Sequence, residues 1–399
     1  VSIALQPMLN RLFNCSHSNA AFKVYDSITK VNHQEWEAVD TSDNIYLSIP
    51  YLHALEQGMS ATMNFRYVTF FNSEDLIIGV AVFQLVHFKA KELLQDRIPC
   101  SIAEKIQTYF LNDKKLSLLI CGNLYACGEN GFAFQGVEKS QFLKILTEVI
   151  SELQNTNYKG DKISFSLIKE FWLTDDGSFS NLNDSGFLDF NIDVNMIFKL
   201  RSEWSSFDDY LESMNTKYRT RAKAVLKKSK DIEVQELAAS DIEKHSDRIN
   251  FLYEQVLQKA TYNLGMLDVR TFLELKKNLG NKFIFKGYFL DGLLVGFTSS
   301  FFYRDIIDAN FVGFEYGINN KYKLYQKMLY DFVNLGIQHQ KSVLRLGRTA
   351  ETSKSGIGAL PVEMKLFARH RNLLPSKLLK PLISAIQPDE FELRRPFKK

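Results

Sequence analysis

The sequence predicts an α/β protein built from two related domains, each with a mixed central sheet flanked by helices. The first observation behind this prediction is an aromatic hairpin pattern at 65–87 that recurs at 283–303. The second is a helix-then-strand pattern after each hairpin, at 141–153 and 163–168 and again at 322–338 and 343–346. The chain has 399 residues, which is enough for two or three domains. A repeated supersecondary unit of this kind predicts two copies of one fold.

Each hairpin joins two apolar strands through a short acidic turn. The turn is Ser73 to Asp75 in the first copy and Asp291-Gly292 in the second. A single glycine follows at the same place in both copies, Gly79 and Gly296. An Asp-Gly pair between two apolar runs is typical of a tight hairpin. The chain also contains 32 Phe and 17 Tyr, which predicts sheets heavily packed with aromatic rings.

The repeat sets the predicted domain boundaries. The first domain is expected at 1–195, after a loosely attached leader, and contains an insertion at 89–130 that the second copy lacks. The second domain is expected at 196–371, and a basic tail follows at 372–399. An apolar strand candidate at 191–200 could leave the first domain and enter the second. Few loops are rich in Gly or Pro, so we expect the halves to be packed together rather than flexibly tethered.

Composition and spacing exclude several classes of function. A net charge of +3 is too small to indicate nucleic-acid binding by the chain as a whole. The four cysteines (Cys15, Cys100, Cys121 and Cys127) and the seven histidines show no ligand or nucleophile spacing, so no metal site or catalytic triad is predicted. No apolar run approaches the ~20 residues of a transmembrane helix. The first residues also lack a signal-peptide pattern, so we expect a cytoplasmic location.

A basic helix is predicted at 217–230, where seven of fourteen residues are basic and none is acidic. Asn215 or Thr216 is the predicted N-cap. A thin apolar stripe follows at helical spacing, formed by Tyr218, Ala222, Val225 and Ser229. The face is either a solvated surface or a site for an anionic partner: a phosphate, a carrier protein, a lipid head group or RNA. The candidate phosphate-binding residues here are Lys217, Arg219 and Arg221.

A second candidate site follows the strand predicted at 306–317. Asn319 or Asn320 is expected to cap the next helix, whose first turn would carry Lys321 and Lys323. The free amides and dipole of a helix N-terminus attract anions, and lysines strengthen that attraction. Glu315, at the end of the strand, would lie beside the bound phosphate.

The polar loop at 346–361 is the third candidate. Arg348 can bind a phosphate or carboxylate bidentately, Lys354 can neutralise one, and Glu351 can accept a proton from an amine. The alternative is a connection whose charges pair only with one another. The glycine-rich segment at 121–132 precedes the helix of the first copy and is interpreted as a turn-rich connector.

The tail combines basic residues with apolar residues at near-helical spacing. We expect it to pack on the second domain, and the alternative is peripheral contact with an anionic membrane. In that alternative the cations facing lipid would be Lys377, Lys380, Arg394 and Arg395.

These motifs resemble the GNAT superfamily of N-acyltransferases, and more specifically the tandem GNAT branch that includes the Fem-type aminoacyl transferases and their FemAB-like relatives. The resemblance covers about 207–364 and rests on the basic helix, the hairpin at 287–297, the helix at 323–333 and the strand-loop at 344–361. The sequence departs from the usual GNAT pattern at 315–323, where EYGINNKYK replaces the R/Q-x-x-G-x-G/A phosphate loop. The helical arm of some Fem proteins is also missing.

The resemblance implies two tandem GNAT-like domains and transfer of an acyl or aminoacyl group from an activated donor to an amine. In the superfamily, the pantetheine arm of the donor lies between two splayed strands and its phosphates rest on a helix N-terminus. The expected base is Glu315 or Glu351, and Tyr325 or Tyr330 would protonate the leaving group. Arg348 and Lys354 would hold an anionic group.

Three functions follow from this resemblance. The first is an N-acyltransferase that uses acyl-CoA or an acyl carrier protein as co-substrate, without a tightly bound cofactor, and an amino-acid-derived amine as acceptor, in lipid or cell-envelope synthesis. The second is a Fem-type peptidyl transferase that uses aminoacyl-tRNA. The third is a non-catalytic GNAT-fold binding protein.

Overall fold

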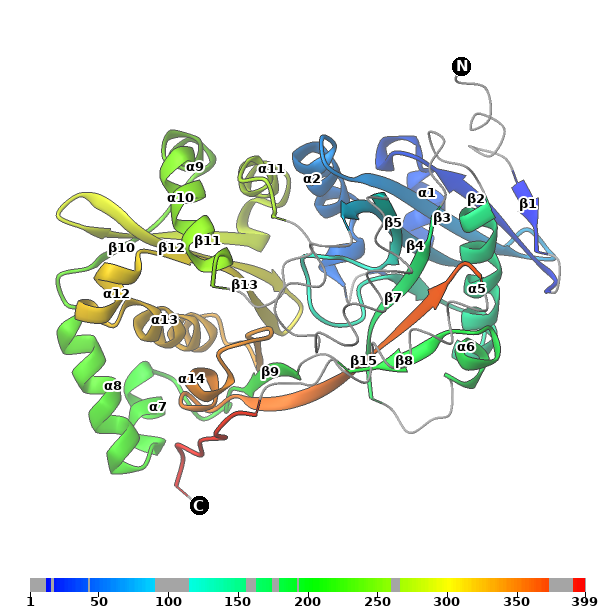
Figure 1. Ribbon diagram of the computed structural model, residues 1–399. Coiled ribbons are helices and arrows are strands. Elements are labelled where there is room, and N and C mark those ends of the chain that lie inside the picture. Colours follow the sequence, from blue (N-terminus) through cyan, green and yellow to red (C-terminus); the bar gives the residue numbers. More distant parts are fainter. Residues whose placement is uncertain are drawn as a thin grey trace, which may run out of the picture. The chain divides into compact units, whose positions relative to one another are not determined.

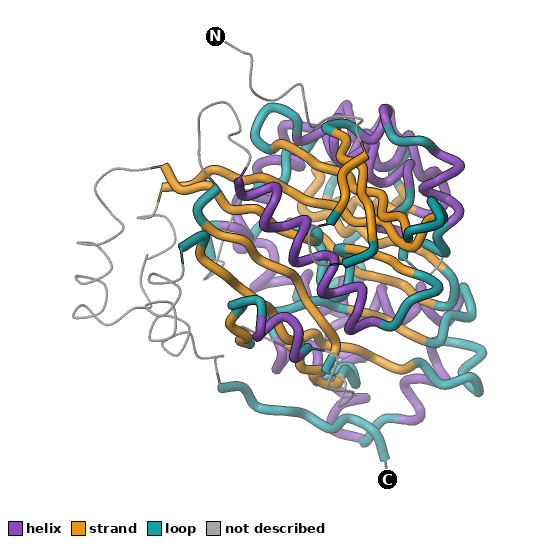
Figure 2. The backbone as a smooth tube through the Cα atoms, turned by 90° about the vertical axis from the view of Figure 1, so that its right-hand side faces the viewer, coloured by secondary structure: helices purple, strands orange, loops and turns teal. Residues whose placement is uncertain are grey.

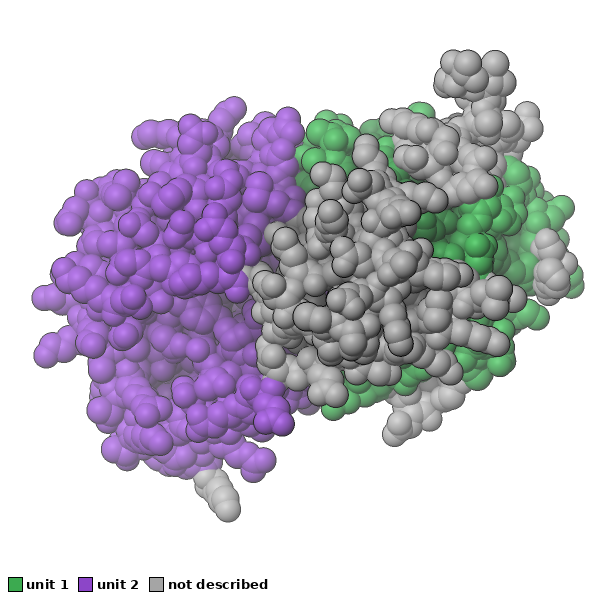
Figure 3. Space-filling view, viewed as in Figure 1, with its two compact units in different colours: residues 1–192, 363–388 green, residues 193–362, 389–399 purple. Residues whose placement is uncertain are grey.

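The computed structural model describes residues 12–15, 18–41, 44–89, 115–155, 163–173, 179–191, 194–259, 266–372 and 390–398. The chain divides into two compact units, coloured separately in Figure 3. Unit 1 comprises Val1–Ile192 and Glu363–Pro388, and unit 2 comprises Asp193–Val362 and Asp389–Lys399. Most of the predicted insertion and of the basic tail lie outside the described residues.

Unit 1 consists of a sheet with helices on both faces (Figure 1). Its strands are β1 (Leu12–Asn14), β2 (Ala20–Tyr25), β3 (Asn64–Asn72), β4 (Ile77–Lys89), β5 (Lys115–Cys121), β6 (Phe132–Phe134), β7 (Phe165–Trp172) and β8 (Leu188–Phe190). Its α-helices are α1 (His33–Ala38), α2 (Ile49–Met59), α5 (Lys139–Asn155) and α6 (Ser180–Asp184).

The hairpin of β3 and β4 carries helices on opposite faces because successive strand residues point to opposite sides. Gly79 faces α5, and a Cβ added there would lie 2.4 Å from Phe142 Cε2. On β3, Val68 belongs to the same core as α5, whereas the hydroxyl of its neighbour Tyr67 donates to Glu56 of α2 at 2.9 Å. Gly79 therefore allows α5 to lie directly against β4.

Unit 2 has the same kind of layered arrangement (Figures 1 and 2). Its strands are β9 (Val194–Lys199), β10 (Glu233–Glu236), β11 (Phe283–Leu290), β12 (Leu293–Tyr303), β13 (Ile306–Phe314) and β14 (Val343–Arg345). Its helices are α7 (Phe207–Ser213), α8 (Thr216–Lys228), α9 (Ala239–Lys244), α10 (Ser246–Leu257), α11 (Arg270–Leu279), α12 (Tyr316–Tyr322), α13 (Leu324–Gln338) and α14 (Glu351–Ser355). The last strand of the chain is β15 (Leu360–His370).

The second hairpin repeats the packing of the first. A Cβ on Gly296 would lie 2.6 Å from Cε of Met328, so this glycine lets α13 approach β12. The next residue, Phe297, points to the opposite face and stacks on Phe272 of α11 with ring centroids 5.6 Å apart. The turn residues Asp291 and Gly292 have φ angles of 49° and 77°, as the predicted two-residue hairpin turn requires.

The two sheets share one strand order, which confirms the internal repeat. In unit 1 the order is β2-β3-β4-β5-β7, and in unit 2 it is β10-β11-β12-β13-β14. Every neighbouring pair is antiparallel except the last, β5–β7 and β13–β14, which are parallel. The register shifts at the same place in both hairpins, next to the pairs Phe70–Gly79 and Tyr288–Gly296. The mixed α/β fold class predicted from the sequence is therefore confirmed.

The sixth strand of each sheet comes from the other half of the sequence. β9 follows the first copy in the chain but pairs antiparallel with β14, with Leu344 opposite Phe198. β15 follows the second copy but pairs antiparallel with β7, with Phe367 opposite Ile168. The strand predicted at 191–200 thus completes the second sheet.

This exchange changes the domain boundaries. The predicted second domain ended at 371, whereas Glu363–Pro388 belongs to unit 1 because β15 pairs with β7 and β8. A linear repeat pattern assigns a strand to the copy that it follows in the chain. Pairing across a sheet does not respect that order.

The described part of the tail packs on unit 2. The Phe397 ring stacks on Phe198 with centroids 5.8 Å apart and lies 5.6 Å from the Trp204 ring. The backbone amide of Asn215 donates to the carbonyl of Pro396 at 2.8 Å. Residues 390–398 are therefore fixed on unit 2, whereas Lys377 and Lys380 lie outside the described residues.

Candidate functional site

The candidate site begins where two parallel strands of unit 2 separate. β13 and β14 pair over three residues, from Ile306–Val343 to Asp308–Arg345. β13 continues on β12 as far as Phe314. The chain after β14 turns away instead, and the amide of Leu346 donates to the carbonyl of Met196 in β9 at 2.8 Å. Two strands that begin as neighbours thus end apart, and the candidate residues lie around this end.

A sharp joint follows β13. The helix predicted at 322–338 is two helices, α12 and α13, which meet at Lys323 with the left-handed angles φ 56° and ψ 40°. Asn320 and Lys321 therefore lie in the last turn of α12 rather than at the start of the long helix. Lys323 occupies the N-cap position of α13, and the side-chain oxygen of Asn319 accepts from the amide of Tyr325 at 2.9 Å. A lone lysine in this backbone region is uncommon and marks a constrained turn.

Glu315 is engaged in an ion pair. Its Oε2 lies 2.5 Å from Nη2 of Arg248 in α10, whose Nε also donates to the carbonyl of Leu294 at 2.7 Å. The carboxylate is about one-third exposed, at 35 %. A carboxylate held this closely by a guanidinium is stabilised in its charged form and is a poor proton acceptor.

Tyr325 and Glu351 are brought together by the fold. The Tyr325 ring lies against Phe314, at the end of β13, with centroids 5.6 Å apart. Burial raises the pKa of the Tyr325 hydroxyl, and the neighbouring carboxylate of Glu351 raises it further. Glu351 is the first residue of α14 and is half-buried. This pair unites a phenol that keeps its proton with a carboxylate, at the end where β13 and β14 separate.

The loop before α14 has a constrained backbone. Gly347, Thr349 and Ala350 have φ angles of 70°, 62° and 54°. Lys354 is 5 % exposed, and its ammonium donates to the carbonyl of Arg348. Lys354 therefore holds the loop from inside, whereas the Arg348 side chain is half-buried. Non-glycine residues in this region cost about 1–3 kcal/mol each and persist where the surrounding structure fixes them.

The basic helix exists as predicted, as α8, and it packs against α7, α12 and α13. The predicted stripe faces inward: Ala222 is fully buried and Ser229 is 2 % exposed. Arg221 lies near Tyr330 of α13, where burial raises the pKa of the phenol to about 12 and the guanidinium opposes that shift. Tyr330 therefore lies among α7, α8 and α13 rather than beside Tyr325 and Glu351.

The cations of α8 repel one another. Like charges stand four residues apart at Lys217–Arg221, Arg219–Lys223 and Lys223–Lys227, and each such pair destabilises an exposed helix by about 0.2–0.5 kcal/mol. Lys217 also stands in the first turn, where the helix dipole disfavours positive charge. Stability alone does not account for this sequence.

A buried polar cluster in unit 2 was missed by the sequence analysis. Nη1 of Arg345 donates to the Tyr303 hydroxyl at 2.8 Å, and that hydroxyl lies 3.5 Å from Oδ2 of Asp308. Asp308 and Arg345 are the last paired residues of β13 and β14, so the cluster lies where the strands separate. The signal was present in the sequence as single charged residues inside the apolar strands 306–314 and 343–346.

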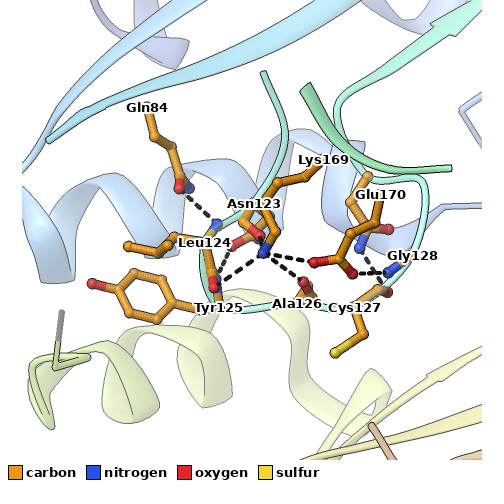
Figure 4. A network of polar contacts seen from close by, with 10 residues as sticks. Gln84, Asn123, Leu124, Tyr125, Ala126, Cys127, Gly128, Lys169 and Glu170 are labelled. Atoms are coloured by element: carbon orange, nitrogen blue, oxygen red, sulfur yellow. Dashed lines mark hydrogen bonds and ion pairs between the residues drawn. The ribbon is translucent and has the colours of Figure 1, made fainter. Parts of the chain in front are cut away.

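A second cluster was missed in unit 1, and Figure 4 shows it. Nζ of Lys169 donates to the carbonyls of Asn123, Leu124 and Ala126 at 2.8, 3.3 and 3.2 Å. It also lies 3.2 Å from Oε1 of Glu170, which is fully buried and whose Oε2 accepts from the amide of Gly128 at 2.9 Å. The predicted turn-rich connector is thus a loop fixed from beneath by β7. A Lys-Glu pair inside an otherwise apolar strand was the available signal.

Two wider searches concern only the part of the chain that the structure describes. Within it, no group of three or more His, Cys, Asp or Glu side chains has the arrangement of a metal site. Within the same residues, no helix combines the length and the apolar character needed to cross a membrane.

Comparison with known proteins supports the fold. No protein-family model matches the sequence, and no curated protein matches it either. The structure of FemX aligns with a TM-score of 0.52 and 12 % identity, covering 88 % of this chain and 98 % of FemX. A tandem GNAT protein from the clavulanic acid biosynthesis pathway aligns with a TM-score of 0.50 and 9 % identity, covering 88 % and 99 %.

These alignments confirm the predicted tandem GNAT fold, of the kind found in Fem-type proteins. The C-terminal domain of a putative lysylphosphatidylglycerol synthetase from Agrobacterium fabrum also matches, at a TM-score of 0.46 and 8 % identity, over 88 % of this chain and 94 % of that one. At such identities the likeness concerns the fold, and activity has to be argued from the site.

Proposed function

We propose that this protein is an N-acyltransferase that moves an acyl group from a thioester donor to the amine of an amino-acid-derived acceptor. The observation that carries the proposal is the separation of β13 and β14 after three paired residues. The resemblance to the GNAT superfamily implies that a pantetheine arm lies between such strands. The equivalent strands of unit 1, β5 and β7, stay paired to Cys121, the last residue of β5, and Lys169 holds the loop beyond it.

The phosphate end of the donor is assigned to the joint between α12 and α13. Lys323 stands at the N-cap of α13, and Lys321 lies in the preceding turn. The positive end of the helix dipole and two ammonium groups favour an anion at this place. Arg348 is a further cationic candidate, in the loop after β14.

The proposed reaction is direct attack of the acceptor amine on the thioester carbonyl. The C–N bond forms, the amine proton passes to the carboxylate of Glu351, and the C–S bond breaks. Tyr325, which keeps its proton because burial and Glu351 raise its pKa, protonates the departing thiolate. Backbone amides at the separated strand ends would stabilise the oxyanion. Glu315 is the less suitable base because Arg248 pairs with it at 2.5 Å.

The first test is binding and turnover with a small thioester. Octanoyl-pantetheine and octanoyl-CoA should raise the Tm, and octanoyl transfer to a panel of amino acids and amines is measured by mass spectrometry. Glu351→Gln should lower kcat about 100-fold or more, the usual effect of removing a general base. Glu315→Gln is the matched control and should lower kcat far less. Absence of binding by every thioester would refute the proposal and favour a non-catalytic binding protein.

The fold similarity to FemX supports a second candidate, aminoacyl transfer from tRNA. In that case turnover would require charged tRNA and would be lost after treatment with ribonuclease. Transfer from octanoyl-pantetheine that resists ribonuclease would exclude a requirement for tRNA.

A further inference from the structure

The seven cations of α8 and the residues just after it have no acidic partner among the described residues, unlike most charged groups of unit 2. On α13, Lys327 pairs with Asp331 at 3.0 Å, and on α11, Lys276 pairs with Glu236 at 2.8 Å. The α8 set forms no ion pair with any described residue and is exposed except for half-buried Arg219. Its members are Lys217, Arg219, Arg221, Lys223, Lys227, Lys228 and Lys230; we name them the α8 cationic face.

The α8 cationic face is larger than a nucleotide requires. A helix of 13 residues is about 20 Å long, and the cations extend from its first turn to just beyond its end. One or two cations at a helix N-terminus are enough to hold a phosphate. A row of unpaired charges along a whole helix indicates a macromolecular partner with an extended negative surface.

The composition of the exposed positions favours a protein over RNA or a membrane. Recognition of single-stranded RNA relies on exposed aromatic rings, but Tyr218, the aromatic residue of α8, is half-buried in the core of unit 2. A helix that enters a membrane interface presents large apolar side chains opposite its cations, but here that side is the stripe that packs on unit 2. The remaining exposed positions of α8 are small: Thr216, Thr220 and Ala224.

The position of α8 connects this surface with the donor. α8 packs against both α12 and α13, whose joint carries Lys321 and Lys323. A carrier protein presents its thioester on a pantetheine arm that begins with a phosphodiester. A carrier docked on α8 could place that phosphodiester at the joint and pass the arm toward the end of β13.

We infer that the α8 cationic face is the docking surface for a small acidic acyl carrier protein, which delivers the acyl group as its thioester. This inference rests on the proposed thioester-dependent function and names the donor class. Opposite charges along two helices would steer the encounter and fix its register. The interaction is therefore expected to weaken as ionic strength rises.

The test compares two double variants of the full chain. Lys223→Glu with Lys227→Glu reverses two charges on α8, and Lys244→Glu with Lys282→Glu reverses two exposed charges elsewhere in unit 2. The Kd for octanoyl-loaded acyl carrier protein is measured by calorimetry at low and moderate salt. We expect the α8 variant to bind at least tenfold more weakly and the control to bind like the unaltered protein. Circular dichroism and Tm establish that both variants are folded.

Octanoyl-pantetheine separates this inference from the proposed function. We expect it to bind the α8 variant and the unaltered protein equally, because it has no carrier protein to dock. If it binds while the carrier protein binds all forms equally or none, docking on α8 is wrong and the function stands. If the α8 variant instead loses affinity for tRNA or for vesicles containing phosphatidylglycerol, the face serves that partner. If no thioester binds at all, both proposals fail.

Discussion

The two units use the same strands and helices but treat the end of the central strand pair in opposite ways. In unit 1, β5 and β7 remain paired to Cys121, and the ammonium of Lys169 fastens the next loop by three carbonyls. In unit 2, β13 and β14 pair over three residues and then diverge around Tyr325 and Glu351. One copy of the fold is closed by its own side chain, and the other is left able to accept a ligand. The difference teaches that chemistry should be sought where the repeat is broken.

The sharpest way to break this comparison is to remove the lysine that closes unit 1. Lys169→Met should destabilise the protein by about 5 kcal/mol, because it leaves the fully buried carboxylate of Glu170 without its cation. Urea denaturation measures the loss. Lys169→Met combined with Glu170→Gln should be milder than the single change, since no buried charge remains. A single variant as stable as the unaltered protein would show that the lysine does not hold the loop.

The exchanged strands give a matched pair of variants. Phe367→Ala should destabilise unit 1, where the ring packs 5.4 Å from that of Phe171, although residue 367 follows the second copy in the sequence. Phe198→Ala should destabilise unit 2, where the ring stacks on Phe397. Each substitution removes a buried aromatic ring and should cost about 3–4 kcal/mol. Hydrogen exchange should show lost protection in β5 and β7 for the first and in β13 and β14 for the second; the reverse pattern would contradict the exchange.

The paired glycines should respond unequally to alanine. At Gly79 the new Cβ would lie 2.4 Å from a ring atom of Phe142, which is fully buried and cannot move aside. At Gly296 it would meet the terminal methyl of Met328, the flexible end of its side chain. Overpacking of this kind costs about 1–3 kcal/mol, so Gly79→Ala should approach 3 and Gly296→Ala about 1. Thermal denaturation of both variants checks the order, and equal losses would mean that α5 and α13 are equally free to shift.

The smallest expected effect is a pH dependence carried by His370 of β15. Burial against unit 1 lowers the pKa of this imidazole below its ordinary value of 6.5. The unfolded chain then takes up a proton near that pH while the folded chain does not, so stability falls as the pH drops below about 6.5. The loss stops growing once the pH passes below the folded pKa. The urea midpoint at pH 7.5 and 5.5 measures it, and His370→Gln should reduce the difference; an unchanged difference would assign it to other groups.

Part of the site could be predicted from the sequence because it depends on local chemistry. The helix with seven cations, the loop with Arg348 and Glu351, and the glycines after both hairpins are readable from residue type and spacing. Residues whose role depends on distant partners were not readable in this way. Glu315 was a candidate base in the sequence, and only the fold places Arg248, 67 residues earlier, at 2.5 Å from it.

The sequence by itself determined that the protein has two copies of one α/β unit, since periodicity, turns and composition repeat along the chain. It also determined where the positive charge gathers, because charge is carried by residue type alone. The tertiary structure decided which copy has separated strands, that the copies exchange β9 and β15, and that Lys169 is used internally in unit 1. These properties depend on pairing between residues far apart in sequence, where burial and hydrogen bonding rather than local propensity select the partner.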